Sequence, residues 1–75
     1  MGNEYAGGIY IVVATKEGHR QYWAAAVPRE RVLEEVRLQA PHGWALALTD
    51  RRLTPKQVVE LKMRPNSVRQ LKEAP

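Results

Sequence analysis

The stretch at residues 9–27 reads IYIVVATKEGHRQYWAAAV and decides the fold of this chain. Residues 9–15 are β-branched or aromatic apart from one alanine, and the run is too short for a helix. A polar segment follows, in which Gly18 suits a backbone with positive φ. Residues 20–27 then read as a second strand. The stretch therefore predicts a β-hairpin whose loop has about two to four residues.

The predicted hairpin is apolar on both faces. Strand alternation places Ile9, Ile11, Val13, Tyr22, Ala24 and Ala26 on one face, and Tyr10, Val12, Ala14, Trp23 and Ala25 on the other. A small sheet with helices on one side should show polar residues on its other side. Either helices cover both faces, or one face meets a partner through Tyr10 and Trp23. A third interpretation is that nucleic-acid bases stack on the aromatic residues beside Arg20. The sequence does not contain the aromatic-rich ribonucleoprotein motif that marks such a surface, and it contains no Phe.

A helix and a third strand are predicted after the hairpin. Pro28 ends the second strand and suits the first turn of a helix. The apolar residues that recur at helical spacing are Val32, Leu33, Val36 and Ala40. The Pro-His-Gly sequence at residues 41–43 ends this helix, and residues 44–49 alternate large and small side chains as a strand does. A right-handed crossover through the helix would make the second and third strands parallel.

Residues 48–72 run basic and resemble a DNA-reading helix-turn-helix at first sight. Thr54 and Gln57 have capping-box spacing around Pro55, which predicts a helix start. The resemblance then fails, because Met63 stands where the turn takes glycine and Pro65 lies inside the motif. The better reading is a capped helix, a proline break, and a last short helix that Asn66 caps.

These elements predict an α+β domain over residues 9–75, preceded by a flexible arm at residues 1–8. The expected order is ββαβα with a short terminal helix. The hairpin and the third strand form a three-stranded mixed sheet, and the helices pack on it.

Charge is distributed unevenly along the chain. The net charge of +4 comes from 12 basic and 8 acidic side chains. The whole excess lies in residues 50–75, which points either to an anionic partner or to a solvated surface. The residues that would contact phosphates of a nucleic acid are Arg51, Arg52, Lys56, Lys62, Arg64 and Arg69.

The sequence offers little material for catalysis. The chain has no cysteine, and its two histidines, His19 and His42, lie in predicted turns without partner ligands. We therefore expect no catalytic residues, no metal, no cofactor and no small-molecule substrate. No apolar run approaches the length of a membrane span, and the absence of cysteine fits a cytoplasmic protein.

Two functions follow as expectations. The first is a non-enzymatic module that binds protein or its own copy, as a homodimer whose interface centres on Tyr10, Val12 and Trp23. The alternative is a nucleic-acid-binding protein that uses the basic C-terminal third for phosphate contacts.

Overall fold

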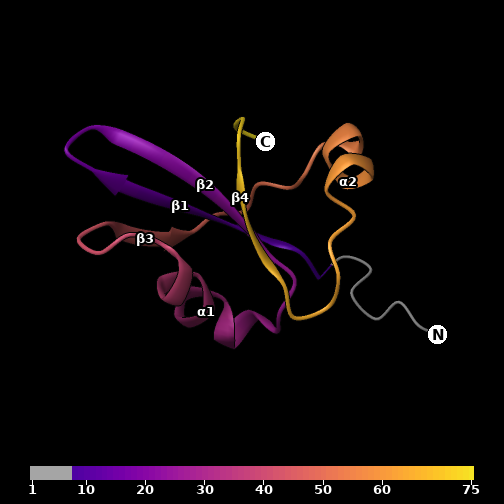
Figure 1. Ribbon diagram of the computed structural model, residues 1–75, viewed down its shortest axis with the longest axis horizontal. Helices are drawn as coiled ribbons and strands as arrows, with labels where there is room; N and C mark the ends of the chain where they lie inside the picture. Colours follow the sequence, from indigo (N-terminus) through magenta and orange to yellow (C-terminus); the bar gives the residue numbers. More distant parts are fainter. Residues whose placement is uncertain (1–7) are drawn as a thin grey trace.

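The computed structural model describes residues 8–75, and these form a four-stranded sheet with two helices (Figure 1). The elements are β1 (Tyr10–Lys16), β2 (His19–Ala25), a 3₁₀ turn (Arg29–Arg31), α1 (Val32–Gln39), β3 (Ala45–Leu48), α2 (Pro55–Leu61) and β4 (Val68–Leu71). The predicted arm at residues 1–8 lies almost wholly outside the described residues and stays a prediction. In the described part of the chain, no helix is long and apolar enough to cross a membrane.

The β1–β2 hairpin forms as the sequence predicts, with the tightest of the expected loops. Lys16 pairs with His19, so only two residues make the turn. Both have positive φ, 50° at Glu17 and 85° at Gly18, as a type I′ turn requires. The predicted division of side chains between the two faces is also confirmed. Ile11 and Ala24 belong to one apolar cluster, and Val12 and Trp23 belong to another.

The α+β class is confirmed, but the three-stranded mixed sheet is wrong. The sheet has four strands in the order β3-β1-β2-β4, and every neighbouring pair is antiparallel. The third strand lies beside β1 and not beside β2, so the chain crosses β1 on its way from β2 through α1 to β3. The physical reason is that the outer edge of β2 is taken by β4, a strand that sequence periodicity does not reveal.

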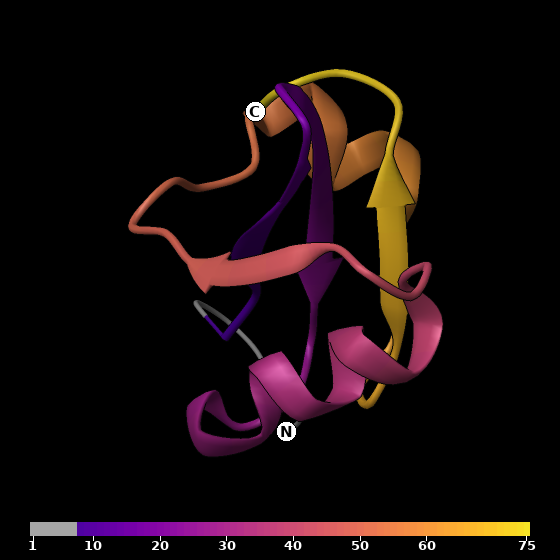
Figure 2. The same cartoon turned by 90° about the vertical axis from the view of Figure 1, so that its left-hand side faces the viewer.

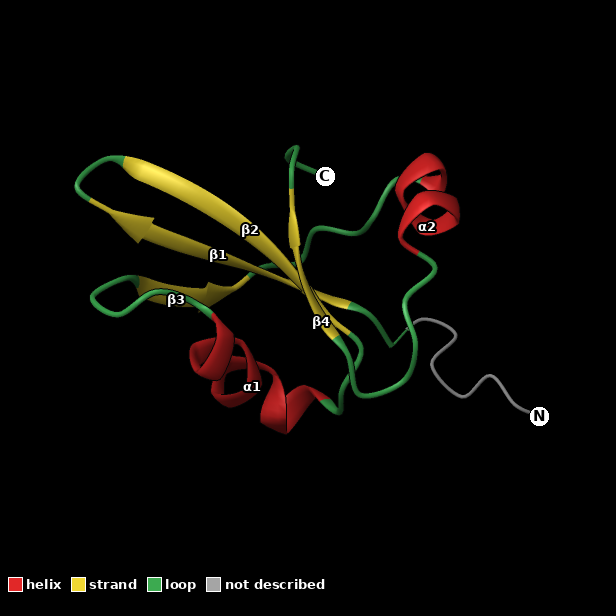
Figure 3. Cartoon of the chain, in the orientation of Figure 1, coloured by secondary structure: helices red, strands yellow, loops and turns green. Residues whose placement is uncertain are grey.

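The predicted terminal helix is wrong, because residues 68–71 form β4 (Figure 3). Asn66 has a φ of 65°, so it occupies the third position of a turn that begins at Arg64 and has Pro65 second. The turn delivers the chain to the edge of β2, where the Ala26 amide donates to the Ser67 carbonyl at 2.9 Å. A strand here satisfies the backbone groups of β2, which a two-turn helix would leave unpaired. Because residues 68–71 form a strand, this segment cannot serve as the recognition helix that a helix-turn-helix needs.

The sheet has two faces with different covers, named here the α1 face and the second face. On the α1 face, Val12 and Trp23 pack with Val32 and Val36 of α1 in the larger buried cluster. On the second face, a smaller cluster centres on Ile11, Ala24 and Leu71, and the residues packed against it are Ile9, Tyr22, Leu53, Leu61 and Met63. Figures 1 and 2 show α1 and α2 on opposite sides of the strands. Of the two explanations for the apolar hairpin, cover on both faces is therefore the one observed.

The cover on the second face is thin. α2 contributes no buried residue, and Val58 and Val59 of that helix are exposed. Only its last residue, Leu61, packs against the smaller cluster. The second face therefore stays open over the half of the sheet nearest the hairpin turn, where Arg20 is exposed.

The start of α2 confirms the predicted capping box. The Gln57 amide donates to Thr54 Oγ1 at 3.1 Å, and the Thr54 amide donates to Gln57 Oε1 at 3.0 Å. Pro55 occupies the first helical position, where its missing N–H costs no hydrogen bond. The helix ends at Leu61, with Lys62 in the left-handed conformation.

Replacing Thr54 by alanine should destabilise the protein by about 1 kcal/mol, because the Gln57 amide loses its partner at the helix start. Urea denaturation followed by circular dichroism measures this change in the free energy of unfolding. Lys56→Ala, an exposed change in the same turn, is the control and should shift stability by less than about 0.5 kcal/mol. Equal stability of Thr54→Ala and wild type would show that α2 does not unfold with the sheet.

Candidate functional site

The residues predicted to form a partner interface lie on the α1 face of the sheet. Val12 is 0% exposed and Trp23 is 7% exposed, and α1 covers this face, so these two side chains offer a partner almost no surface. Tyr10 packs against the same cluster but is half-buried, and it lines a hollow beside Arg51 and Arg52. Self-association through these three residues stays a prediction.

The basic residues predicted to contact phosphate separate into three groups. Arg51 and Arg52 line a hollow of about 580 Å³ beside Tyr10. Lys56 and Arg69 line a groove of about 420 Å³ between α2 and β4. The remaining two, Lys62 and Arg64, lie in the connection between these elements and line neither space. The structure therefore does not gather all six residues into one surface.

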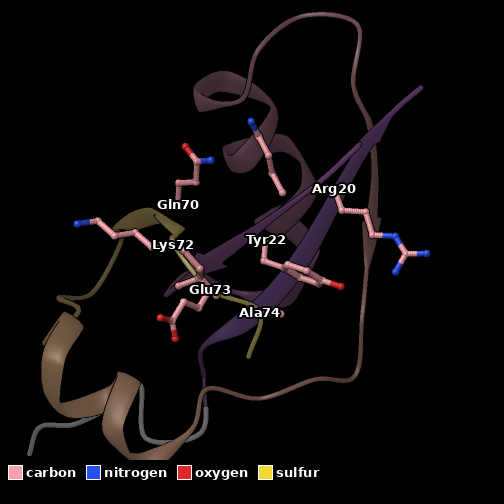
Figure 4. Close-up of a pocket in the computed structure, with 8 residues that line it drawn as sticks. Arg20, Tyr22, Gln70, Lys72, Glu73 and Ala74 are labelled. Atoms are coloured by element: carbon pink, nitrogen blue, oxygen red, sulfur yellow. The ribbon is translucent and has the colours of Figure 1, made fainter. Parts of the chain in front are cut away.

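One cluster does combine positive charge with an aromatic ring, and it lies on the second face. This Tyr22 patch consists of Tyr22, Arg20, Arg51 and Arg69. Arg20 and Tyr22 are two residues apart in β2 and so share a face, and Figure 4 shows both side chains projecting from β2 in the same direction. Arg69 lies on the same face, because it pairs with Ala24 across the β2–β4 ladder.

Arg51 completes the patch from a loop far away in the sequence. Its guanidinium carbon lies 5.4 Å from the centroid of the Tyr22 ring, which is cation–π geometry. Thr49 fixes the loop, since its Oγ1 donates to the Ile11 carbonyl at 2.8 Å and accepts from the Arg51 amide at 3.1 Å. Arg51 Nη1 also donates to the Pro75 carbonyl at 3.2 Å. The guanidinium is thus held over the ring before any ligand arrives.

Tyr22 also borders a hollow of about 600 Å³ where β2 extends past the end of β4 (Figure 4). Arg20 and Lys72 contribute positive charge to its lining, and Glu73 is the one acidic residue there. The hollow has the size of a small-ligand site, but it is open and shallow. It extends the Tyr22 patch toward the edge of the sheet.

The arginines of the Tyr22 patch carry uncompensated charge. Within residues 8–75 the ion pair observed is Arg31–Glu35 at 2.8 Å on α1, and none of Arg20, Arg51 and Arg69 forms an ion pair with an Asp or Glu side chain there. Three cations on one face of a sheet create a positive potential that attracts an anion. The residues described contain no group of three His, Cys, Asp or Glu side chains that could hold a metal ion.

Sequence reasoning did not single out Tyr22 as a site residue. Strand alternation assigns Tyr22 to the correct face, and the position of Arg20 beside an aromatic residue is the feature of the sequence that points to this site. The approach of Arg51 could not be foreseen, because 29 positions separate it from Tyr22 and only the fold brings them together. No protein-family model, no curated protein and no solved structure matches this chain. Its function is therefore inferred from the chemistry of this surface.

Proposed function

We propose that this protein is a non-enzymatic binding module whose Tyr22 patch holds single-stranded nucleic acid in the cytoplasm. The observation that carries the proposal is the Arg51 guanidinium over the Tyr22 ring, with Arg20 and Arg69 on the same face. The proposal keeps the basic C-terminal third as the source of phosphate contacts, and it moves the centre of the site to β2.

The chemistry of the patch suits a single strand. Unstacked bases stack on aromatic rings and on guanidinium planes, and the Arg51–Tyr22 pair offers both. Arg20 and Arg69, which flank Tyr22 on neighbouring positions of the sheet, can neutralise the phosphates on either side of a stacked base. A duplex hides its bases, so it would gain only the phosphate contacts. The protein should therefore bind single strands more tightly than duplexes, with little dependence on base sequence.

Neutralising the patch should weaken binding strongly. Arg20→Gln, Arg51→Gln and Arg69→Gln in one chain should raise the dissociation constant for a 12-nucleotide single strand about tenfold or more at low salt. Removing the two phosphate contacts of Arg20 and Arg69 should also flatten the dependence of log K on log salt by roughly 1.4. Fluorescence anisotropy of labelled RNA and DNA oligonucleotides over a salt series measures both quantities.

A charge-matched variant separates the patch from net charge. Lys16→Gln, Arg29→Gln and Arg37→Gln remove three exposed positive charges outside the patch and outside the basic C-terminal third, and they give the same net charge. This variant should keep most of the affinity. If both variants lost the same affinity, the loss would be explained by the lower net charge and not by the Tyr22 patch. No binding of the wild type to either oligonucleotide at low salt would reject the proposed function.

A further inference from the structure

Within residues 8–75, no strand lies beside the outer edge of β3. β3 is the last strand of the sheet on the β1 side, and its four residues, Ala45–Leu48, carry no charge (Figure 3). An unprotected edge strand of this kind is a template for pairing with another strand. Natural sheets normally guard such edges with charged residues, prolines or bulges.

The backbone groups that face this open edge can be identified. The Thr49 amide donates to the Ile11 carbonyl at 2.9 Å, so Thr49 and Ile11 are a hydrogen-bonded pair. Hydrogen-bonded pairs alternate along an antiparallel ladder, so Ala47 and Ala45 also point their backbone groups at β1. The N–H and C=O groups of Leu46 and Leu48 therefore point away from the sheet. None of the hydrogen bonds found in residues 8–75 uses these groups.

The opposite edge of the sheet is built differently. By the same alternation, Val68 and Gln70 of β4 point their backbone groups outward, with Arg69 between them. If two copies paired Val68 with Gln70 about a two-fold axis, Arg69 would face Arg69 of the other copy. Like charges directly opposite one another destabilise strand pairing. The edge of β4 is therefore protected against self-pairing in this register, and the edge of β3 carries no such charge.

We propose that β3 is the seam of a homodimer, in which two copies pair antiparallel about a two-fold axis through Ala47. Leu46 of each copy then exchanges both backbone hydrogen bonds with Leu48 of the other. The side chains that meet at the axis are the two Ala47 methyl groups, which are exposed in the single chain and small enough for close approach. In this register the outward-facing N–H and C=O groups of Leu46 and Leu48 in one copy bond to the same groups in the other copy, as a two-fold interface requires.

The pairing would join two sheets into one of eight strands. α1 packs on the α1 face of the sheet, and a two-fold axis perpendicular to the sheet keeps that face on one side, so the α1 helices of both copies would lie on the same side of the joined sheet. Tyr22, Val13 and Ala47 form one row across the second face. The two Tyr22 patches would therefore share a face, about 24 Å apart at five strand spacings.

A single cysteine at the axis tests the register directly, because the natural chain contains none. Ala47→Cys should form a covalent dimer in most of the protein under mild oxidation, since opposed residues of such a pair lie within disulfide distance. Ala45→Cys is the matched control, with the same residue change on an exposed position of the same strand and face. In the proposed register, position 45 of one copy is offset by four residues along the strands from position 45 of the other copy. The two introduced thiols would therefore be too far apart to bond, and little covalent dimer should form.

Solution mass provides the second measurement. Light scattering should show the wild-type chain shifting toward twice its 8.6 kDa mass as concentration rises into the high micromolar range. Ala47→Lys should stay folded and monomeric, because two ammonium groups would meet at the axis. Equal cross-linking at positions 45 and 47, or a wild type that stays monomeric, would overturn the inference. Neither outcome affects the nucleic-acid proposal, which concerns residues within one copy.

Discussion

Val36→Asp is expected to leave the chain unfolded. Val36 is 0% exposed and packs in the larger cluster with Val12, Trp23 and Val32. A carboxylate there would be buried without a partner, and with the lost apolar packing the cost should exceed about 4 kcal/mol. A chain of this length has a total stability of about 4 to 11 kcal/mol, and a small domain lies toward the lower end of that range, where this single change removes all of the stability.

The same charge on the other side of α1 provides the control. Leu38 is 76% exposed, as expected from its place outside the apolar stripe of the helix. Leu38→Asp should therefore change the free energy of unfolding by less than about 0.5 kcal/mol. Circular dichroism and the dispersion of amide signals in proton NMR spectra distinguish folded from unfolded chains. A folded Val36→Asp protein would mean that α1 is not an essential part of the core.

Trp23→Ala should cost about 3 to 5 kcal/mol of stability. Trp23 is the largest side chain in the buried cluster, and its Nε1 donates to Gln21 Oε1 at 3.2 Å. Alanine would leave a cavity between β2 and α1 in a protein with little stability to spare. Urea denaturation followed by far-UV circular dichroism is the appropriate measurement, because the change also removes one of the two tryptophan fluorophores.

Trp44→Ala is the comparison for this prediction. Trp44 packs against the same cluster but stays partly exposed, so its removal should cost clearly less than that of Trp23. The comparison also bears on the sequence-based idea that Trp23 meets a partner. A stable, monomeric Trp23→Ala protein would show that this side chain does not hold the core together and would return it to consideration as an interface residue.

Local rules accounted for the elements that lie close together in the sequence. The β1–β2 hairpin follows from β-branched residues on both sides of Gly18, and α2 begins where the capping box of Thr54 and Gln57 predicts. These features depend on backbone preferences and hydrogen bonds within a few residues. For the same reason, strand alternation assigned the correct face to every hairpin residue that the two apolar clusters contain.

The same rules failed at β4. Val68 and Leu71 are three residues apart, which suits one side of a helix. In the structure they lie on opposite faces of a strand, Val68 with the larger cluster and Leu71 with the smaller one. A four-residue segment carries too little periodicity to distinguish these readings. Residues 68–71 form a strand because they pair with the otherwise unpaired edge of β2, which lies 43 positions or more away along the chain.

For this protein the sequence by itself determined the hairpin, the capped start of α2 and the distribution of apolar residues between two faces, because each depends on short-range geometry. Only the tertiary structure decided that α1 buries Val12 and Trp23, that β3 lies beside β1, and that Arg51 reaches Tyr22. These outcomes depend on which strand edges and apolar surfaces remain available once the chain has folded back on itself. That competition takes place between segments distant in sequence, so no local pattern records its result.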